Sequence, residues 1–198
     1  MVKHKKLILS VAGLSVLLAG IFAVYSFQKI SKIPQLPILG RVGSFALTDS
    51  DGQPFDSRQL HGKVWIANFF FTTCSDVCPV MTKHMASLSR TFEKVPAVKM
   101  VSFTVNPEMD SPEILKAYST PLNKGKGNWY FLTGKREDIR DITVTQFKLG
   151  KIDEPIFHSS YFPLVDRSGF IRGYYEGTNT EEINRLFKDA SALLKERF

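Results

Sequence analysis

Residues 63–79 read KVWIANFFFTTCSDVCP, and this stretch decides the fold. Its first half, Lys63 to Phe71, is a nearly continuous run of apolar, β-branched and aromatic residues, which is typical of a strand buried on both faces. A helix is expected directly afterwards, because Pro79 suits a first helical turn and apolar residues then recur at helical spacing, at Met81, Met85, Leu88 and Phe92. The pattern predicts a central strand that passes into a helix through a turn holding two cysteines.

The flanking sequence continues this alternation of strands and helices. The expected elements are a hairpin at 45–55, strands at 97–105 and 129–132, helices at 110–118 and 135–147, a second hairpin at 160–175 and a helix at 180–197. Thr178 or Thr180 is the expected amino-terminal cap of the last helix. Alternation that ends in a hairpin and a helix predicts an α/β fold, a mixed sheet flanked by helices on both faces.

The amino terminus combines a basic segment with a long apolar one. Residues 1–6 contain three lysines, and residues 7–27 carry no charged side chain. The second segment is long enough to cross a bilayer core of about 30 Å, whereas the apolar region of a cleaved signal peptide, the alternative, runs to only about 7–15 residues. Ala19-Gly20 is followed by Ile21 and not by cysteine, so no lipid-attachment site is expected there. The sequence predicts an uncleaved transmembrane helix.

This segment also predicts the domain organisation. Positive charge stays on the cytoplasmic side of a membrane, so the chain after the span should lie outside the cytoplasm. The expected parts are a cytoplasmic basic segment at 1–6, a transmembrane anchor at 7–27, an extracytoplasmic tether at 28–42 and one folded domain at 43–198. We therefore expect a single-pass protein of the bacterial inner (plasma) membrane, with a periplasmic or otherwise extracytoplasmic carboxyl-terminal domain.

The net charge of +7 is concentrated near the amino terminus. Residues 1–32 hold five of the 26 basic residues and no acidic ones, which leaves 21 basic against 19 acidic residues for the rest of the chain. Basic residues beside an apolar span usually face lipid headgroups. Because the remainder is close to neutral and shows no basic stripe, we expect no nucleic-acid partner.

Cys74 and Cys78 are the two cysteines of the chain. Ligands gather at the carboxyl ends of strands in open α/β sheets, and a helix amino terminus stabilises anionic sulfur, so a lowered thiolate pKa is expected. Side chains at i and i+4 share one helix face, so the sulfurs can converge on one ion or bond each other. A purely structural disulfide is the alternative, although a bridge across so short a loop would stabilise the fold little.

A third candidate ligand is His158, directly before the expected strand at 160–165. In an α/β sandwich, the residues that lead into a neighbouring strand can face the turn that carries the cysteines. Two thiolates and an imidazole suit Cu(I) and can also hold Cu(II), whereas structural zinc normally needs a fourth protein ligand. Met81 and Met85 could be thioether donors, but core packing is the favoured interpretation. Three other histidines, His4, His61 and His84, are not assigned to the site.

Residues Phe71-Thr-Thr-Cys-Ser-Asp-Val-Cys-Pro79, together with His158, resemble the SCO/SenC family of copper-binding proteins of cytochrome c oxidase assembly. Val101-Ser-Phe-Thr-Val-Asn-Pro-Glu-Met-Asp-Ser-Pro-Glu113 is similar to a second family signature, and His158-Ser-Ser-Tyr with Leu164-Val-Asp-Arg-Ser-Gly169 to a third. The resemblance runs from about Phe45 to the carboxyl terminus. The chain departs from the family pattern at Asn106, where aspartate is usual, at Met109, where arginine is common, and at Pro163, which interrupts a strand.

The resemblance implies a thioredoxin-like fold in which Cys74, Cys78 and His158 bind a copper ion. The implied partner is the CuA-bearing subunit of cytochrome c oxidase, to which a metallochaperone of this kind delivers copper or whose site it prepares. The alternative is a thiol-disulfide oxidoreductase, acting on the cysteines of that subunit or of other extracytoplasmic proteins, with Cys74 and Cys78 forming a redox-active disulfide when oxidised. A thiol peroxidase fits poorly, because Phe71 stands where peroxiredoxins carry threonine. An inert structural domain is the remaining alternative.

Overall fold

The computed structural model describes residues 20–21, 36–123, 127–150 and 159–196. The chain divides into two units, Met1–Gln35 and Leu36–Phe198. Within the described residues, no helix is both long enough and apolar enough to cross a membrane. Apart from Gly20 and Ile21, the predicted span at 7–27 lies outside the described part of the chain, so the transmembrane helix stays a prediction.

The second unit is built on one mixed sheet, as predicted. Its described strands run in the order β1-β8-β7-β4-β5-β6-β2-β3. Their bounds are β1 Gly40–Arg41, β2 Ala46–Asp49, β3 Pro54–Asp56, β4 Val64–Phe70, β5 Val98–Thr104, β6 Trp129–Thr133, β7 Tyr161–Val165 and β8 Phe170–Glu176. Strand β4 pairs in parallel with β5 and antiparallel with β7, and all seven of its residues are buried. The apolar run therefore forms the central strand that the sequence predicts.

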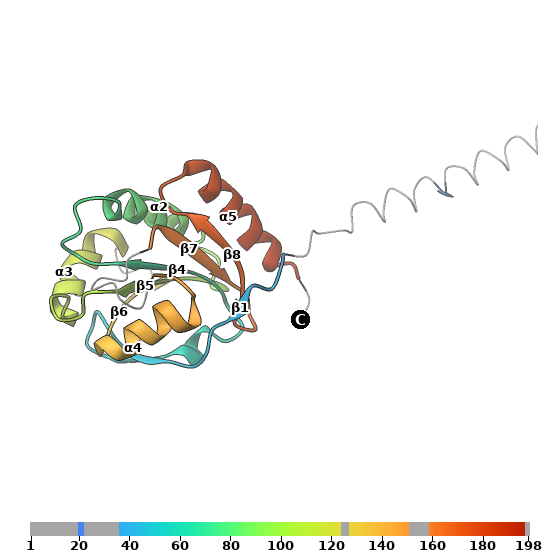
Figure 1. The fold of residues 1–198 in the computed structure, drawn as a ribbon. Coiled ribbons are helices and arrows are strands. Elements are labelled where there is room, and N and C mark those ends of the chain that lie inside the picture. Colours follow the sequence, from blue (N-terminus) through green and yellow to red (C-terminus); the bar gives the residue numbers. More distant parts are fainter. Residues whose placement is uncertain (1–19, 22–35, 124–126, 151–158, 197–198) are drawn as a thin grey trace, which may run out of the picture. The chain divides into compact units, whose positions relative to one another are not determined.

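Helices cover both faces of this sheet (Figure 1). They are α2 Cys78–Thr91, α3 Pro112–Asn123, α4 Arg136–Arg140, which continues as a π-helical segment Asp141–Gln146, and α5 Thr180–Leu193. One core cluster joins Met85, Leu115 and Leu186 from α2, α3 and α5 to one face. A second cluster packs Ile139 and Phe147 against the other face. This arrangement confirms the predicted α/β layers.

The amino-terminal cap of α5 differs from the prediction. The residue at that position is Asn179, whose side-chain oxygen accepts hydrogen bonds from the amides of Glu181 at 2.8 Å and Glu182 at 3.3 Å. Thr178 instead donates its hydroxyl to Glu176 at 3.1 Å. Asparagine caps a helix at least as well as threonine, so the prediction of Thr178 or Thr180 was wrong by one residue.

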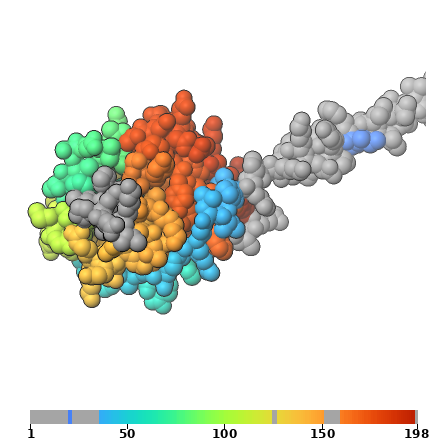
Figure 2. All heavy atoms as spheres, viewed as in Figure 1, coloured from blue at the N-terminus to red at the C-terminus, as the bar shows by residue number. Residues whose placement is uncertain are grey.

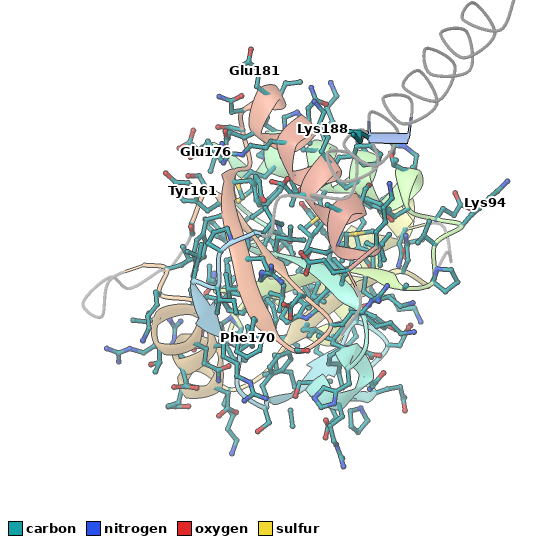
Figure 3. The ribbon with its side chains drawn as sticks, turned by 90° about the vertical axis from the view of Figure 1, so that its right-hand side faces the viewer. Lys94, Tyr161, Phe170, Glu176, Glu181 and Lys188 are labelled. Carbon is teal, nitrogen blue, oxygen red and sulfur yellow. The ribbon has the colours of Figure 1, made fainter. Side chains whose placement is uncertain are left out.

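Pro163 changes the pairing between β4 and β7. Two ladder pairs form beyond it, Trp65 with Val165 and Ile66 with Leu164. Towards the other end the chains meet again only at an isolated bridge between Phe69 and Ser159, which is displaced by two residues from the ladder register. Proline has no backbone donor, which accounts for a break in the ladder at this point. Figure 3 shows the Tyr161–Glu176 end of the β7–β8 hairpin, next to Ser159, and the Phe170 end far from it.

The two ends of the second unit meet at its surface. In Figure 2 the blue residues of the β1 region adjoin the red carboxyl-terminal part. Arg172 of β8 joins them, because its guanidinium donates to the carbonyl oxygen of Leu36 at 2.6 Å and to the carboxylate of Glu196 at 3.1 Å. The same guanidinium donates to Asp166 at 2.9 Å. A buried charge cluster thus fixes both ends of this unit.

Candidate metal and thiol site

The two cysteines lie together where β4 passes into α2. Cys78 is the first residue of α2 and is 3% exposed, whereas Cys74 is partly exposed on the preceding loop. The loop turns tightly, because the amide of Cys74 donates to the carbonyl oxygen of Phe71 at 3.2 Å. Both cysteines are free thiols, and Cys74 is close enough to contribute to the raised pKa of Cys78. One accessible and one buried sulfur therefore converge on the same point.

The structure corrects the expected acidity of Cys78. Burial, followed by the hydrogen bond with Cys74, raises the pKa of the Cys78 thiol to about 12. Its position at the start of α2 does not outweigh this, since desolvation penalises the thiolate most strongly. In the metal-free reduced protein Cys78 is therefore protonated at neutral pH, and a cation or an oxidant has to displace that proton.

Tyr118 of α3 forms one wall of the site. Its ring stacks on Phe70 with centroids 5.4 Å apart, and its hydroxyl lies 2.9 Å from the hydroxyl oxygen of Thr82 in α2. Burial raises the pKa of Tyr118, and the negative charges of Cys78, Cys74 and Asp110 add to that rise. These three groups therefore lie within electrostatic reach of one phenol.

Asp110 lies behind the cysteine loop and is completely buried. Its carboxylate accepts hydrogen bonds from the amide of Thr72 at 3.1 Å, the hydroxyl of Thr72 at 2.5 Å and the hydroxyl of Thr104 at 2.5 Å. We did not predict Asp110 or Thr72 as site residues from the sequence. A usable signal was present, because Asp110 follows the end of β5 at the sheet edge from which the cysteine loop also emerges.

His158, the predicted third ligand, lies outside the described residues. Its neighbour Ser159 is described and pairs with Phe69, near the carboxyl end of β4. Met81 and Met85 are 1% and 0% exposed within the core cluster, which confirms the packing interpretation. Within the described ranges, no three His, Cys, Asp or Glu side chains group as a metal site.

The other described histidines lie elsewhere. His84 contacts the carbonyl oxygen of Gly177 through Nδ1 at 2.8 Å. His61 lines a cavity of about 450 Å³ together with Arg41 and Trp65, and the described lining of that cavity includes neither cysteine. These contacts give neither histidine a described interaction with Cys74 or Cys78.

Comparison with known proteins identifies the family. The SCO1/SenC family model matches residues 39–194. The chain belongs to the SCO1/SenC family. The SCO1 protein homolog of Bacillus subtilis is 30% identical over 162 residues, which cover 79% of this chain and 84% of that protein. A putative copper-binding protein of Stutzerimonas stutzeri is 29% identical over 153 residues, which cover 70% of this chain and 71% of that protein.

Solved structures of SCO1/SenC proteins share the fold. A SCO1/SenC family lipoprotein from Bacillus anthracis superposes with a TM-score of 0.71 at 34% identity, covering 79% of this chain and 96% of that one. BsSco, described as having a disulfide switch and as a member of the Sco family of cytochrome c oxidase assembly proteins, gives a TM-score of 0.70 at 31% identity, covering 81% and 98%. The predicted thioredoxin-like sheet flanked by helices is thereby confirmed.

Proposed function

We propose that this chain binds a copper ion and delivers it to, or prepares, the CuA site of cytochrome c oxidase. The proposed ligands are Cys74, Cys78 and His158. Membership of the SCO1/SenC family and similarity to a copper-binding protein and to a cytochrome c oxidase assembly protein support this function. In this function copper is the cargo, and the CuA-bearing subunit is the partner that receives it.

One observation carries the proposal: the two free thiols converge at the turn between β4 and α2. Soft sulfur donors select copper over the harder cations that prefer oxygen. Cys74 is partly exposed and gives a partner access to the site, whereas Cys78 is shielded from solvent. This pair therefore suits a metal that is bound firmly and yet has to be handed on.

The described chain next to His158 supports its role as third ligand. Ser159 pairs with Phe69 of β4, and Cys74 follows β4 by four residues. Ser159 therefore lies near the end of β4 from which the cysteine loop emerges, and His158 directly precedes Ser159 in the sequence. An imidazole complements two thiolates as a copper ligand.

The proposal includes the predicted domain organisation. Residues 7–27 would anchor the chain, residues 1–6 would remain in the cytoplasm, and residues 28–42 would tether the copper domain outside it. This places the domain in the compartment where oxidation of paired cysteines is permitted.

Copper titration of the reduced full-length chain, purified in detergent without oxygen, tests the function. We expect one copper per chain and sulfur-to-copper charge-transfer bands. Cys74→Ala and Cys78→Ala should each lower copper affinity more than about a hundredfold, and His158→Ala at least about tenfold. For comparison, mutation of a residue that only contacts a metal ligand lowers metal affinity about 10- to 100-fold. His61→Ala is the matched control and should bind normally. Unchanged affinity in the His158 variant would remove this residue from the site, and unchanged affinity in both cysteine variants would refute the proposal.

The thiol pair also favours a second function, thiol-disulfide exchange. An accessible cysteine beside a buried one suits attack by Cys74 on a partner disulfide, which gives a mixed disulfide and releases one partner thiolate. Cys78 then attacks the Cys74 sulfur and releases the second partner thiol, so two electrons pass from this chain to the partner. Reduction of an oxidised CuA-subunit peptide by the His158→Ala variant at the wild-type rate would favour this function over copper delivery.

A further inference from the structure

The cysteine loop is tied to the neighbouring strand through the buried carboxylate of Asp110. Thr72, two residues before Cys74, donates two hydrogen bonds to this carboxylate, one from its amide and one from its hydroxyl. Thr104, the last residue of β5, donates its hydroxyl to Oδ2 of the same carboxylate, the oxygen that also accepts the Thr72 amide at 3.1 Å. Asp110 therefore joins the exits of the two parallel strands, β4 and β5, directly behind the thiols.

The loop that carries Asp110 is itself braced. The amide of Asp110 donates to the carbonyl oxygen of Asn106 at 3.0 Å, and the amide of Asn106 donates to the hydroxyl oxygen of Thr104 at 3.0 Å. The amide of Val105 donates to the carbonyl oxygen of Phe70 at 2.8 Å. The carboxylate thus has a fixed position relative to the sheet, and Thr72 is held against a rigid support.

An ionised carboxylate imposes more order on Thr72 than a neutral side chain would. It accepts hydrogen bonds and donates none, so both Thr72 donors have to point towards it. Hydrogen bonds to an ionised acceptor are also roughly twice as strong as neutral ones. Two such bonds from one residue fix its backbone as well as its side chain, which restricts the path of the chain to Cys74.

Burial of this carboxylate is unfavourable in free energy, which argues against a purely structural role. The hydrogen bonds that Asp110 accepts come from the neutral groups of Thr72 and Thr104. A buried charge without an opposite charge is usually unfavourable unless hydrogen bonds or a bound cation compensate it. The position of this charge, close to Tyr118 together with both thiols, agrees with a role at the site.

We propose that Asp110 is a positioning residue of the thiol site, which acts through Thr72 to hold Cys74 at the spacing that copper binding requires. The proposal rests on the copper function above in what it says of the metal, but its effect on the two sulfurs is independent of copper. Because the hydrogen bonds exist with both thiols free, the clamp should stabilise the dithiol form, and its loss should favour the disulfide form.

Two substitutions break the clamp, and two others serve as controls. Asp110→Asn removes the charge at constant size, and Thr72→Val removes the hydroxyl donor and keeps the side-chain shape. Thr72→Ser restores that donor. Thr143→Val removes another buried threonine hydroxyl, which donates to Ile139 at 2.8 Å within the helical segment on the opposite face of the sheet.

The first readout is the dithiol-disulfide equilibrium of the metal-free full chain in buffers of reduced and oxidised glutathione. Asp110→Asn and Thr72→Val should shift it about fivefold towards the disulfide, and Thr72→Ser should return it to within about twofold of wild type. The second readout is copper affinity, which the first two variants should lower about tenfold. Urea unfolding of each variant checks that it is folded and measures its free energy of unfolding.

Thr143→Val separates positioning from general destabilisation. It should lose stability as Thr72→Val does and leave both thiol readouts unchanged. Equal shifts in Thr143→Val and Thr72→Val would overturn the proposal, as would a folded Thr72→Val protein with the wild-type thiol equilibrium. If wild type binds no copper, the proposed function fails, and the glutathione equilibrium still decides the role of Asp110.

Discussion

Two buried aspartates in this domain meet the cost of burial in different ways. Asp166 is 1% exposed and lies in the turn between β7 and β8, where it accepts hydrogen bonds from the amides of Ser168 and Phe170 and from the guanidinium of Arg172. Asp110 is equally buried, yet its described partners are neutral. Asp166 is paired with a guanidinium where the two ends of the domain meet, whereas Asp110 accepts hydrogen bonds from neutral donors beside the thiols, where we propose that a cation binds.

The largest expected effect comes from breaking the compensated cluster. Arg172→Met leaves the carboxylate of Asp166 buried without its partner, and removes the donors to Glu196 and to the carbonyl oxygen of Leu36. Removal of one member of a buried ion pair costs about 3–5 kcal/mol. Urea unfolding measures this loss. The thiol equilibrium in glutathione should not change, because this cluster lies outside the cysteine site.

The matched control for that change is Arg185→Met on the exposed face of α5. Arg185 pairs with Glu182 at 2.7 Å, with side chains 58% and 26% exposed, and its guanidinium also lies 5.1 Å from the ring centroid of Tyr175. Exposed pairs contribute at most about 1 kcal/mol. A loss as large as that of Arg172→Met would show that burial is not what makes the Arg172 cluster strong.

The second prediction compares the two aspartates directly. Asp166→Asn should lower the free energy of unfolding by about 3 kcal/mol, because the buried guanidinium of Arg172 then loses one of its two carboxylate partners. Asp110→Asn should lower the free energy of unfolding by only about 1 kcal/mol, because weaker hydrogen bonds are partly offset by the removal of a buried charge whose hydrogen-bond donors, Thr72 and Thr104, are neutral. Urea unfolding of both variants at pH 7 gives the two values. If Asp110→Asn loses more stability than Asp166→Asn, the carboxylate of Asp110 serves chiefly to stabilise the fold.

The third prediction concerns alkaline pH. Burial and Cys74 raise the pKa of Cys78 from 9.0 to about 12, so the folded protein keeps a proton that the unfolded chain loses. The resulting stabilisation is complete below pH 9 and falls as the pH rises towards 12. Between pH 9 and 10 the reduced metal-free protein should lose about 1 kcal/mol through this group.

Cys78→Ser isolates the thiol from the other groups that titrate at high pH, such as Tyr118, whose pKa burial also raises. Urea unfolding of wild type and variant at pH 8, 9 and 10 should give a difference that narrows as the pH rises. A constant difference would mean that the Cys78 thiol titrates as it does in the unfolded chain.

The fold was largely predictable because its strongest signals are local. The apolar run that forms β4 and the helical spacing of Met81 and Met85 both reflect burial that one segment shows by itself. The cap of α5 was misassigned because three adjacent residues, Thr178, Asn179 and Thr180, can all cap a helix. The backbone conformation places Asn179 at the capping position. Local patterns fix an element more firmly than its boundary.

The candidate site was less predictable, because its properties depend on contacts between distant segments. Asp110 reaches Thr72 across 38 residues of sequence, so neither residue stands out by itself. The pKa of Cys78 rises through burial and Cys74, whereas we expected the helix amino terminus to lower it. Cys74 and Cys78 were identifiable from spacing, whereas the groups that surround them required the packed structure.

The smallest expected effect comes from an exposed ion pair on the same loop as Asp110. Glu108 pairs with Arg136 through two hydrogen bonds, and the interaction with Arg136 holds the pKa of Glu108 below its usual range. The side chains of Glu108 and Arg136 are 51% and 39% exposed, so solvent and salt screen the attraction. Glu108→Gln should therefore change stability by less than about 1 kcal/mol, and by less still in 1 M NaCl. Its thiol equilibrium should match wild type, because the bonds between Asp110 and Thr72 remain. A shift like that of Asp110→Asn would instead mean that the loop as a whole, and not the buried carboxylate, positions Cys74.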